Sequence, residues 1–286
     1  MTQAPLGIIA GLGDLPVSIA GQRAARGAPV YILRIAGFEE PRLSAYPGAV
    51  VGYGEVGRQI ALLKEAGCED LVFAGIVKRP DFSALKLDFR AVKLMPKVLM
   101  AARKGDDALL RVMVGVFEAE GFNVLAAEEA NSDLSLDAGL LAGPAPDASA
   151  QADAETALGI AREMGWLDIG QGCIVCDGLV LAVEAQEGTD QMLARCAALP
   201  EEIRGTSDRP RGVLAKAPKP IQERRIDLPT IGPATLEGAA AAGLAGIALE
   251  AGGALILERE RVQMLARDLG IFVLAVDPVP DGGRQA

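Results

Sequence analysis

Short apolar runs alternate with helical patterns over the first 125 residues of the chain. The runs are rich in Val, Ile and Leu, and the segments between them repeat apolar residues at helical spacing. This alternation is typical of a parallel β-sheet with covering helices. The expected strands are 6–10, 29–34, 50–52, 70–75 and 122–126, and the expected helices are 15–26, 55–66 and 107–120.

The pattern breaks at residues 128–152, EEANSDLSLDAGLLAGPAPDASAQA, where Pro, Ser, Asp and Gly accumulate. Such a composition predicts an inter-domain linker. The chain is therefore expected to hold a Rossmann-like α/β domain over 1–127 and a distinct C-terminal α/β domain over 153–277. Residues 278–286 are expected to form a frayed tail.

Apolar runs and helical patterns also alternate in the C-terminal half. Asp177-Gly178 separates two apolar runs within 172–184, which is a strong signal for a β-hairpin. The remaining expected elements are the helices 154–164, 189–199, 234–249 and 259–269 and the strands 212–216, 254–257 and 271–276.

The chain of 286 residues contains no histidine. This absence excludes Ser-His-Asp and Cys-His nucleophile systems, histidine zinc sites and two-histidine iron sites. Any metal would have to bind carboxylates, carbonyls and substrate oxygens, which favours Mg²⁺, with Mn²⁺ as the alternative.

The net charge of −10 conceals two basic segments. Residues 72–104 carry a net +6 and residues 204–225 a net +5, which leaves −21 on the rest of the chain. This distribution predicts a localised anion site between two domains. Lys78 and Arg79 follow an expected strand and are candidate ligand contacts, whereas Lys86, Arg90, Lys93 and Lys97, at helical spacing, are interpreted as a solvated helix face. Nucleic acid is not expected as a partner, because aromatic residues for base stacking are almost absent near these segments.

Compartment signals are consistent with a cytoplasmic protein. The N-terminus has no basic start or small-residue cleavage site of a signal peptide. The uncharged stretch 238–249 is shorter than the roughly 20 apolar residues that span a bilayer. Cys173 and Cys176 have CxxC spacing but lie in an apolar run, so a buried structural pair is favoured over redox or metal chemistry.

A glycine turn, Gly11-Leu12-Gly13-Asp14, connects the first expected strand to a helix. Glycine lets the backbone approach a ligand, and a helix N-terminus offers N–H groups to a phosphate or sugar. The alternative is that Asp14 only caps the helix. Pro16 replaces the third glycine of a dinucleotide fingerprint, which argues against a dinucleotide site.

Two further helix starts carry candidate ligand-binding groups. Asp106 and Asp107 follow Lys104, and Thr189 and Asp190 follow a glycine. Capping and the helix dipole explain acidic residues at such positions without any ligand. Contact with a ligand or a metal is the alternative.

Four cations lie in the proline-rich segment 212–233. Prolines stiffen the loop, and Asp227 is a carboxylate among its cations. This composition fits phosphate binding by the cations, with Asp227 as metal ligand or general base. The cations are Lys216, Lys219, Arg224 and Arg225.

Seven motifs in this order resemble the LpxI-type UDP-2,3-diacylglucosamine pyrophosphatases of lipid A biosynthesis. RRIDLPTIGP at 224–233 is the most specific of them. The others are GLGDLP at 11–16, FAGIVKRP at 73–80, GDDALLR at 105–111, EGFNV at 120–124, GTDQM at 188–192 and GVLAKAPKP at 212–220.

The resemblance implies Mg²⁺-dependent hydrolysis of UDP-2,3-diacylglucosamine to UMP and 2,3-diacylglucosamine 1-phosphate (lipid X), with water attacking the β-phosphorus. It also implies a homodimer that contacts the inner membrane transiently as a peripheral protein. The critical acid of the family maps onto Asp227, here the expected metal ligand. Lys216, Lys219 and Arg225 are the expected catalytic cations. The expected substrate contacts are Gly11, Leu12, Gly13, Asp14, Lys78, Arg79, Lys104, Asp106, Asp107, Thr189, Asp190, Arg224 and Thr230.

Two other functions are compatible with the same motifs. One is a different nucleotide-sugar enzyme, a transferase or an epimerase, on a similar sheet. The other is a non-catalytic module that binds a lipid or a nucleotide. Both remain open at the level of sequence.

Overall fold

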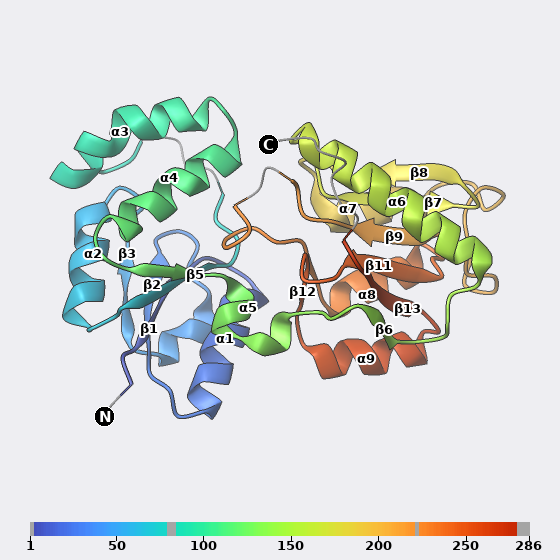
Figure 1. Cartoon of the computed structure of the whole chain (residues 1–286), viewed down its shortest axis with the longest axis horizontal. Coiled ribbons are helices and arrows are strands. Elements are labelled where there is room, and N and C mark those ends of the chain that lie inside the picture. Colours follow the sequence, from blue (N-terminus) through green and yellow to red (C-terminus); the bar gives the residue numbers. More distant parts are fainter. Residues whose placement is uncertain (1–2, 79–83, 221–222, 279–286) are drawn as a thin grey trace. The chain divides into compact units, whose positions relative to one another are not determined.

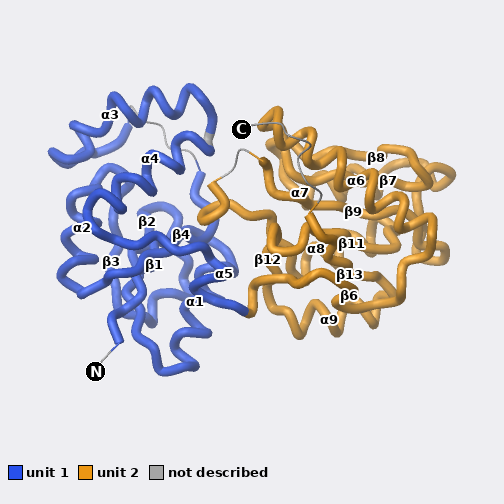
Figure 2. Tube along the Cα trace, viewed as in Figure 1, with its two compact units in different colours: residues 1–132 blue, residues 133–286 orange. Residues whose placement is uncertain are grey.

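A computed structural model describes residues 3–78, 84–220 and 223–278. The chain divides into two compact units, residues 1–132 and residues 133–286 (Figure 2). Each unit is an α/β structure with its own sheet (Figure 1). This confirms the predicted fold class, a Rossmann-like N-terminal part followed by a distinct C-terminal α/β part.

Unit 1 contains a five-stranded parallel sheet with the order β3-β2-β1-β4-β5. All five residues of β1 are buried, as expected for a central strand of a parallel sheet. The strands are β1 (Leu6–Ala10), β2 (Val30–Ile35), β3 (Gly48–Val51), β4 (Asp70–Ala74) and β5 (Asn123–Leu125). The helices are α1 (Asp14–Ala25), η1 (Pro41–Ala45), α2 (Val56–Glu65), α3 (Phe89–Ala102), α4 (Asp106–Glu118) and α5 (Ala127–Ala130).

The strand order of unit 1 places a topological switch point between β1 and β4, because the chain continues from β1 to one side and from β4 to the other. The loops that follow these two strands meet in an isolated antiparallel bridge between Leu12 and Ile76. Gly11 is required by this close approach, since a Cβ there would lie 2.4 Å from the Ile76 carbonyl oxygen.

Unit 2 contains a six-stranded mixed sheet with the order β6-β13-β11-β9-β7-β8. The predicted hairpin is confirmed as β7 and β8, which pair antiparallel. The strands are β6 (Gly139–Ala142), β7 (Gly172–Cys176), β8 (Leu179–Val183), β9 (Val213–Lys216), β11 (Gly246–Glu250) and β13 (Phe272–Val276), with a separate pair of β10 (Thr230–Ile231) and β12 (Leu255–Ile256). The helices are η2 (Ser132–Leu134), α6 (Ala148–Trp166), α7 (Gly188–Ala197), α8 (Pro233–Ala241) and α9 (Arg259–Asp268).

Helices cover both faces of the unit 2 sheet, so two apolar clusters form. On one face α6 packs on β7, β9 and β11, with alanines such as Ala157 and Ala161 fully buried. On the other face α7, α8 and α9 contribute Leu193, Leu236 and Val262 to the second cluster. Small side chains on α6 allow this long helix to lie close to the strands.

Two sequence predictions require correction. Residues 128–152, predicted as an inter-domain linker, include the boundary between the two units, after residue 132. They nevertheless hold regular structure: most of α5, η2, β6, which pairs with β13, and the first residues of α6. The predicted helix 234–249 ends at Ala241 and gives way to strand β11. Gly243 adopts a left-handed φ of 74° at this break, a conformation that glycine takes at low cost after a helix.

The CxxC cysteines lie on β7 as free, buried thiols. Residues three apart on a strand point to opposite faces of the sheet, so the pair does not form a shared site. Burial raises the pKa of the Cys173 thiol to about 12, and a thiol that stays protonated is a poor nucleophile and a poor metal ligand. These observations support the structural interpretation of the pair.

Candidate active site

Three buried charged residues lie at the ends of three strands, at one edge of the unit 2 sheet. Lys216 is the last residue of β9, Glu250 is the last residue of β11, and Glu184 directly follows β8. The exposed fractions are 4%, 6% and 6% for Lys216, Glu184 and Glu250. Strands β9 and β11 run parallel, and β8 has the same direction because two antiparallel pairings relate it to β9. The edge is therefore the carboxyl edge, where α/β sheets bind ligands.

A hydrogen-bonded chain links Lys216 to Glu184 through Thr189. The Lys216 ammonium donates to Thr189 Oγ1 at 2.7 Å, and the Thr189 hydroxyl donates to Glu184 Oε1 at 2.6 Å. Lys216 also lies 3.4 Å from the carbonyl oxygen of Thr230 and 4.0 Å from Glu184 Oε1. The predicted residues Lys216, Thr189 and Thr230 are thus brought together, although Thr230 contributes its main chain.

Burial and nearby charges act in opposite directions on Lys216. Burial lowers the pKa of its ammonium from the ordinary value, while the negative charges of Glu184, Asp190 and Asp227 raise it. A buried lysine surrounded by carboxylates is a candidate functional group rather than a surface cation. Asp227 lies in an exposed turn, and its N–H donates to the Glu223 carbonyl at 3.3 Å.

Glu184 is the residue of this site that the sequence analysis missed. Its second carboxylate oxygen, Oε2, is buried without a hydrogen-bond partner among the described residues. Gly172 on β7 makes room for this oxygen, since a Cβ at that position would lie only 2.7 Å from Oε2. The sequence signal that could have indicated it is an acidic residue directly after the apolar run 179–183, as Lys216 comes at the end of the run 213–216.

The three other cations of the proline-rich segment 212–233 have carboxylate partners. Lys219 donates to Asp168 Oδ1 at 2.7 Å, and Arg225 Nε donates to Glu223 Oε1 at 2.9 Å. Arg224 lies 3.7 Å from Glu250 Oε1. The sequence suggested a cage of cations, whereas the structure shows ion pairs. A bound phosphate would therefore compete with these carboxylates for the cations.

Glu250 is held at the carboxyl edge by a second arginine. Arg162 on α6 donates to Glu250 Oε2 at 3.0 Å through Nε and at 2.8 Å through Nη2. Arg224 Nη2 also donates to the Gly252 carbonyl at 3.2 Å. Arg162 and Arg224 therefore pair with different oxygens of the buried Glu250 carboxylate. Glu250 thus anchors Arg224 beside the edge that carries Lys216.

In unit 1 the glycine turn uses its N–H groups internally. Gly11 donates to the Ala74 carbonyl at 2.9 Å, and Leu12 donates to the Ile76 carbonyl at 3.0 Å. Gly13 N–H donates to Glu40 Oε2 at 3.1 Å. A carboxylate of the chain itself therefore occupies the position at which the sequence suggested a phosphate or sugar. Binding at this turn remains a prediction, and a ligand that accepts from the Gly13 N–H would have to displace Glu40.

Glu40 and Asp14 share one arginine next to this turn. Arg42 forms ion pairs with Asp14 at 2.8 Å and with Glu40 at 2.7 Å. The hydrogen bond from Arg42 and the backbone N–H of Gly13 lower the pKa of Glu40 from 4.5 to about 2, against an opposing effect of burial. Asp14 is thus part of a local ion-pair network at the start of α1.

Replacing Glu40 with Gln is expected to remove an acid-sensitive part of the stability. A carboxylate whose folded pKa is lowered stabilises the fold above its ordinary pKa of 4.5, and this contribution is lost as the pH falls through about 2. Urea unfolding over this pH range should show a steeper loss for the wild type than for E40Q. The difference at neutral pH should be roughly 1–2 kcal/mol, reduced by solvent screening at the half-exposed Arg42. The exposed Glu65→Gln on α2 is the control, and equal pH slopes for wild type and E40Q would contradict the prediction.

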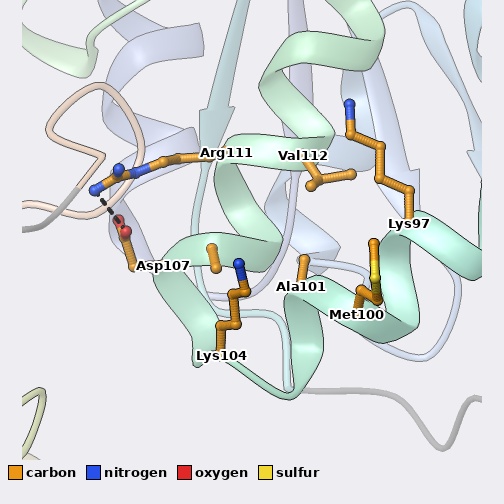
Figure 3. Close-up of a pocket in the computed structure, with 8 residues that line it drawn as sticks. Lys97, Met100, Ala101, Lys104, Asp107, Arg111 and Val112 are labelled. Atoms are coloured by element: carbon orange, nitrogen blue, oxygen red, sulfur yellow. Dashed lines mark ion pairs between the residues drawn. The ribbon is translucent and has the colours of Figure 1, made fainter.

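The described interactions do not bring the remaining predicted substrate-binding residues of unit 1 together into one site. Lys78 has an exposed side chain, and its carbonyl accepts from the Tyr53 hydroxyl at 2.6 Å. Arg79 and the Asp106 side chain lie outside the described residues. Asp107 forms an ion pair with Arg111 at 2.8 Å along α4. Asp107 and Lys104 line a groove of about 380 Å³ between α3 and α4 (Figure 3).

Comparison with known proteins covers both units. Residues 5–134 match the family model described as the LpxI N-terminal domain, and residues 137–274 match the LpxI C-terminal domain. A protein of Caulobacter vibrioides named UDP-2,3-diacylglucosamine pyrophosphatase LpxI is 55% identical over 273 residues, which is 96% of this chain and 98% of that protein. The chain belongs to the LpxI family.

Proposed function

We propose that this chain hydrolyses the pyrophosphate bond of UDP-2,3-diacylglucosamine in lipid A biosynthesis. The supporting observation is identity of 55% over nearly the full length of a relative whose name states this activity. Water attacks the β-phosphorus, a new P–O bond forms to the water oxygen, and the bond from that phosphorus to the bridging oxygen breaks. UMP leaves, and 2,3-diacylglucosamine 1-phosphate, lipid X, is the other product.

Lys216 is the principal electrostatic residue in this proposal. Its ammonium is buried at the carboxyl edge and oriented by Thr189. A cation held in a site of low dielectric stabilises charge that develops on phosphoryl oxygens more strongly than a mobile surface cation does. Lys219 and Arg225 stabilise the remaining charge after exchanging their carboxylate partners for substrate oxygens.

Mg²⁺ is the proposed cofactor, with Mn²⁺ as the alternative. The described residues contain no group of three or more acidic or Cys side chains that could hold a metal ion on their own. Mg²⁺ commonly binds one or two carboxylates together with substrate phosphates, and the exposed carboxylate of Asp227 fits that role. When bound, the ion supplies Lewis-acid polarisation of the phosphate.

A panel of UDP-sugars tests the function. The chain is incubated with acylated and non-acylated UDP-sugars in Mg²⁺ or in EDTA, and ³¹P NMR identifies the products. Hydrolysis to UMP should be restricted to the diacylated sugar and should be abolished by EDTA. Transferred or epimerised products would favour another nucleotide-sugar enzyme. Binding without turnover would favour a non-catalytic module. Equal hydrolysis of acylated and non-acylated UDP-sugars would count against the proposed substrate.

Two further properties belong to the proposal. The first is the homodimer and the second is transient contact with the inner membrane as a peripheral protein. No helix in the described part of the chain has both the length and the apolar character needed to cross a bilayer. The proposed membrane contact is surface binding, which suits an enzyme whose substrate and product carry two acyl chains.

A further inference from the structure

Helix α3 in unit 1 exposes a mixed apolar and basic face. Phe89 and Met100 are the most exposed apolar side chains of this helix, at 76% and 65%. Val92 and Leu99 are also exposed, at 53% and 43%. Apolar side chains of this size on one solvent-facing surface mark an interaction site.

The exposed residues of α3 share one side of the helix. They recur at intervals of three and four residues, which places them in a single stripe. The opposite side of α3 packs on α4 and α2, and Ala91, Ala101 and Ala102 are buried. Figure 1 shows α3 at the periphery of unit 1, beyond α4. The outward stripe comprises Phe89, Val92, Lys93, Pro96, Lys97, Leu99, Met100 and Arg103.

The charge of this face has one sign. Residues 89–105 contain five Lys or Arg and no Asp or Glu. The Lys93 ammonium lies 4.3 Å from the centroid of the Phe89 ring, so cation and apolar group are adjacent on the stripe. Lys97 and Lys104 border the groove beside Met100 (Figure 3). Arg90 is on the inner side, where it pairs with Glu120.

We propose that the outward face of α3 docks on the surface of an anionic lipid bilayer. Lysines alongside exposed Phe, Leu and Met are the composition of helices that lie in the membrane interface. A protein partner is disfavoured, because lysine is depleted in the cores of protein–protein interfaces. On a chain with net charge −10, a basic face also selects the orientation in which the protein approaches a negative surface. This inference rests on the proposed function in one respect: it names the surface that would make the proposed membrane contact.

Flotation of the full-length chain with vesicles tests the docking without any turnover. Wild type should bind phosphatidylcholine vesicles that contain phosphatidylglycerol, bind pure phosphatidylcholine weakly, and release as NaCl is raised. K93E/K97E should lower the partition coefficient by at least about tenfold, and F89S/V92S by about tenfold. The control M264S/R267E alters exposed residues on α9 and should bind like wild type.

The outcomes separate this proposal from the function. Because the vesicles carry no substrate, wild-type flotation that fails overturns the docking proposal and leaves hydrolysis unaffected. Flotation that persists in both α3 variants also overturns it. Light scattering measures the oligomeric state of the same proteins. If the α3 variants change a dimer to a monomer and no protein floats, this face is a self-association surface and the docking proposal is overturned. The converse result, flotation with no hydrolysis in the UDP-sugar panel, leaves the docking intact and overturns the enzymatic function.

Discussion

Asp227→Asn is expected to lower kcat by about 10³-fold, equivalent to ~4 kcal/mol of transition-state stabilisation. The amide keeps the size of the side chain and removes the charge that a divalent cation requires. Asp227 is exposed, so the fold should be unchanged and the unfolding midpoint should stay at the wild-type value. Initial rates on UDP-2,3-diacylglucosamine over a range of Mg²⁺ concentrations measure both the loss and the weakened metal dependence.

Asp208→Asn is the matched control for this substitution. Asp208 is an exposed aspartate in the same unit and is not among the candidate site residues, so its rate should equal the wild-type rate. KM should rise little in D227N, because the cations that contact the substrate remain. Wild-type turnover with wild-type Mg²⁺ dependence in D227N would remove Asp227 from the mechanism.

Strand and helix positions were predictable wherever the chain alternates between the two patterns. The strand 6–10, the hairpin in 172–184 and the helix 259–269 were all recognised, because each combines a clear period with a glycine or polar boundary. The helix predicted for 234–249 was wrong beyond Ala241, since the uncharged stretch 238–249 of Ala, Gly, Leu and Ile has no polar positions that would reveal a period. Strand β6 was not predictable, because its four residues lie among prolines and glycines and its partner strand, β13, is distant in the sequence.

The cations of the site were predictable, but their partners were not. A dense group of Lys and Arg in a proline-rich loop is visible in the sequence. Asp168, Glu184 and Glu250 reach that group only through the fold, from other strands and loops. Likewise nothing local indicated that Glu40 accepts the Gly13 N–H, so the turn looked more available to a phosphate than it is.

Lys216→Met is expected to reduce kcat/KM by at least about 10²-fold, the effect of removing one preorganised electrostatic group. Met has a similar length, but it leaves the buried Glu184 carboxylate without its cation, so K216M should also lose stability. Rates are therefore compared at a temperature well below its unfolding midpoint. Arg261→Met, an exposed cation on α9, is the control and should be fully active. If K216M kept wild-type kcat/KM, the ammonium would have no part in stabilising the transition state.

Glu184→Gln tests how Lys216 is kept charged. Glu184 raises the pKa of Lys216 against the lowering effect of burial, so its neutralisation lowers that pKa further. Since the cationic form binds phosphoryl oxygens, the alkaline fall in kcat/KM should move to lower pH. A purely structural role would lower the rate equally at every pH and leave the profile in place. If kcat/KM fell at the same alkaline pH in E184Q as in the wild type, Glu184 would have no effect on the charge of Lys216.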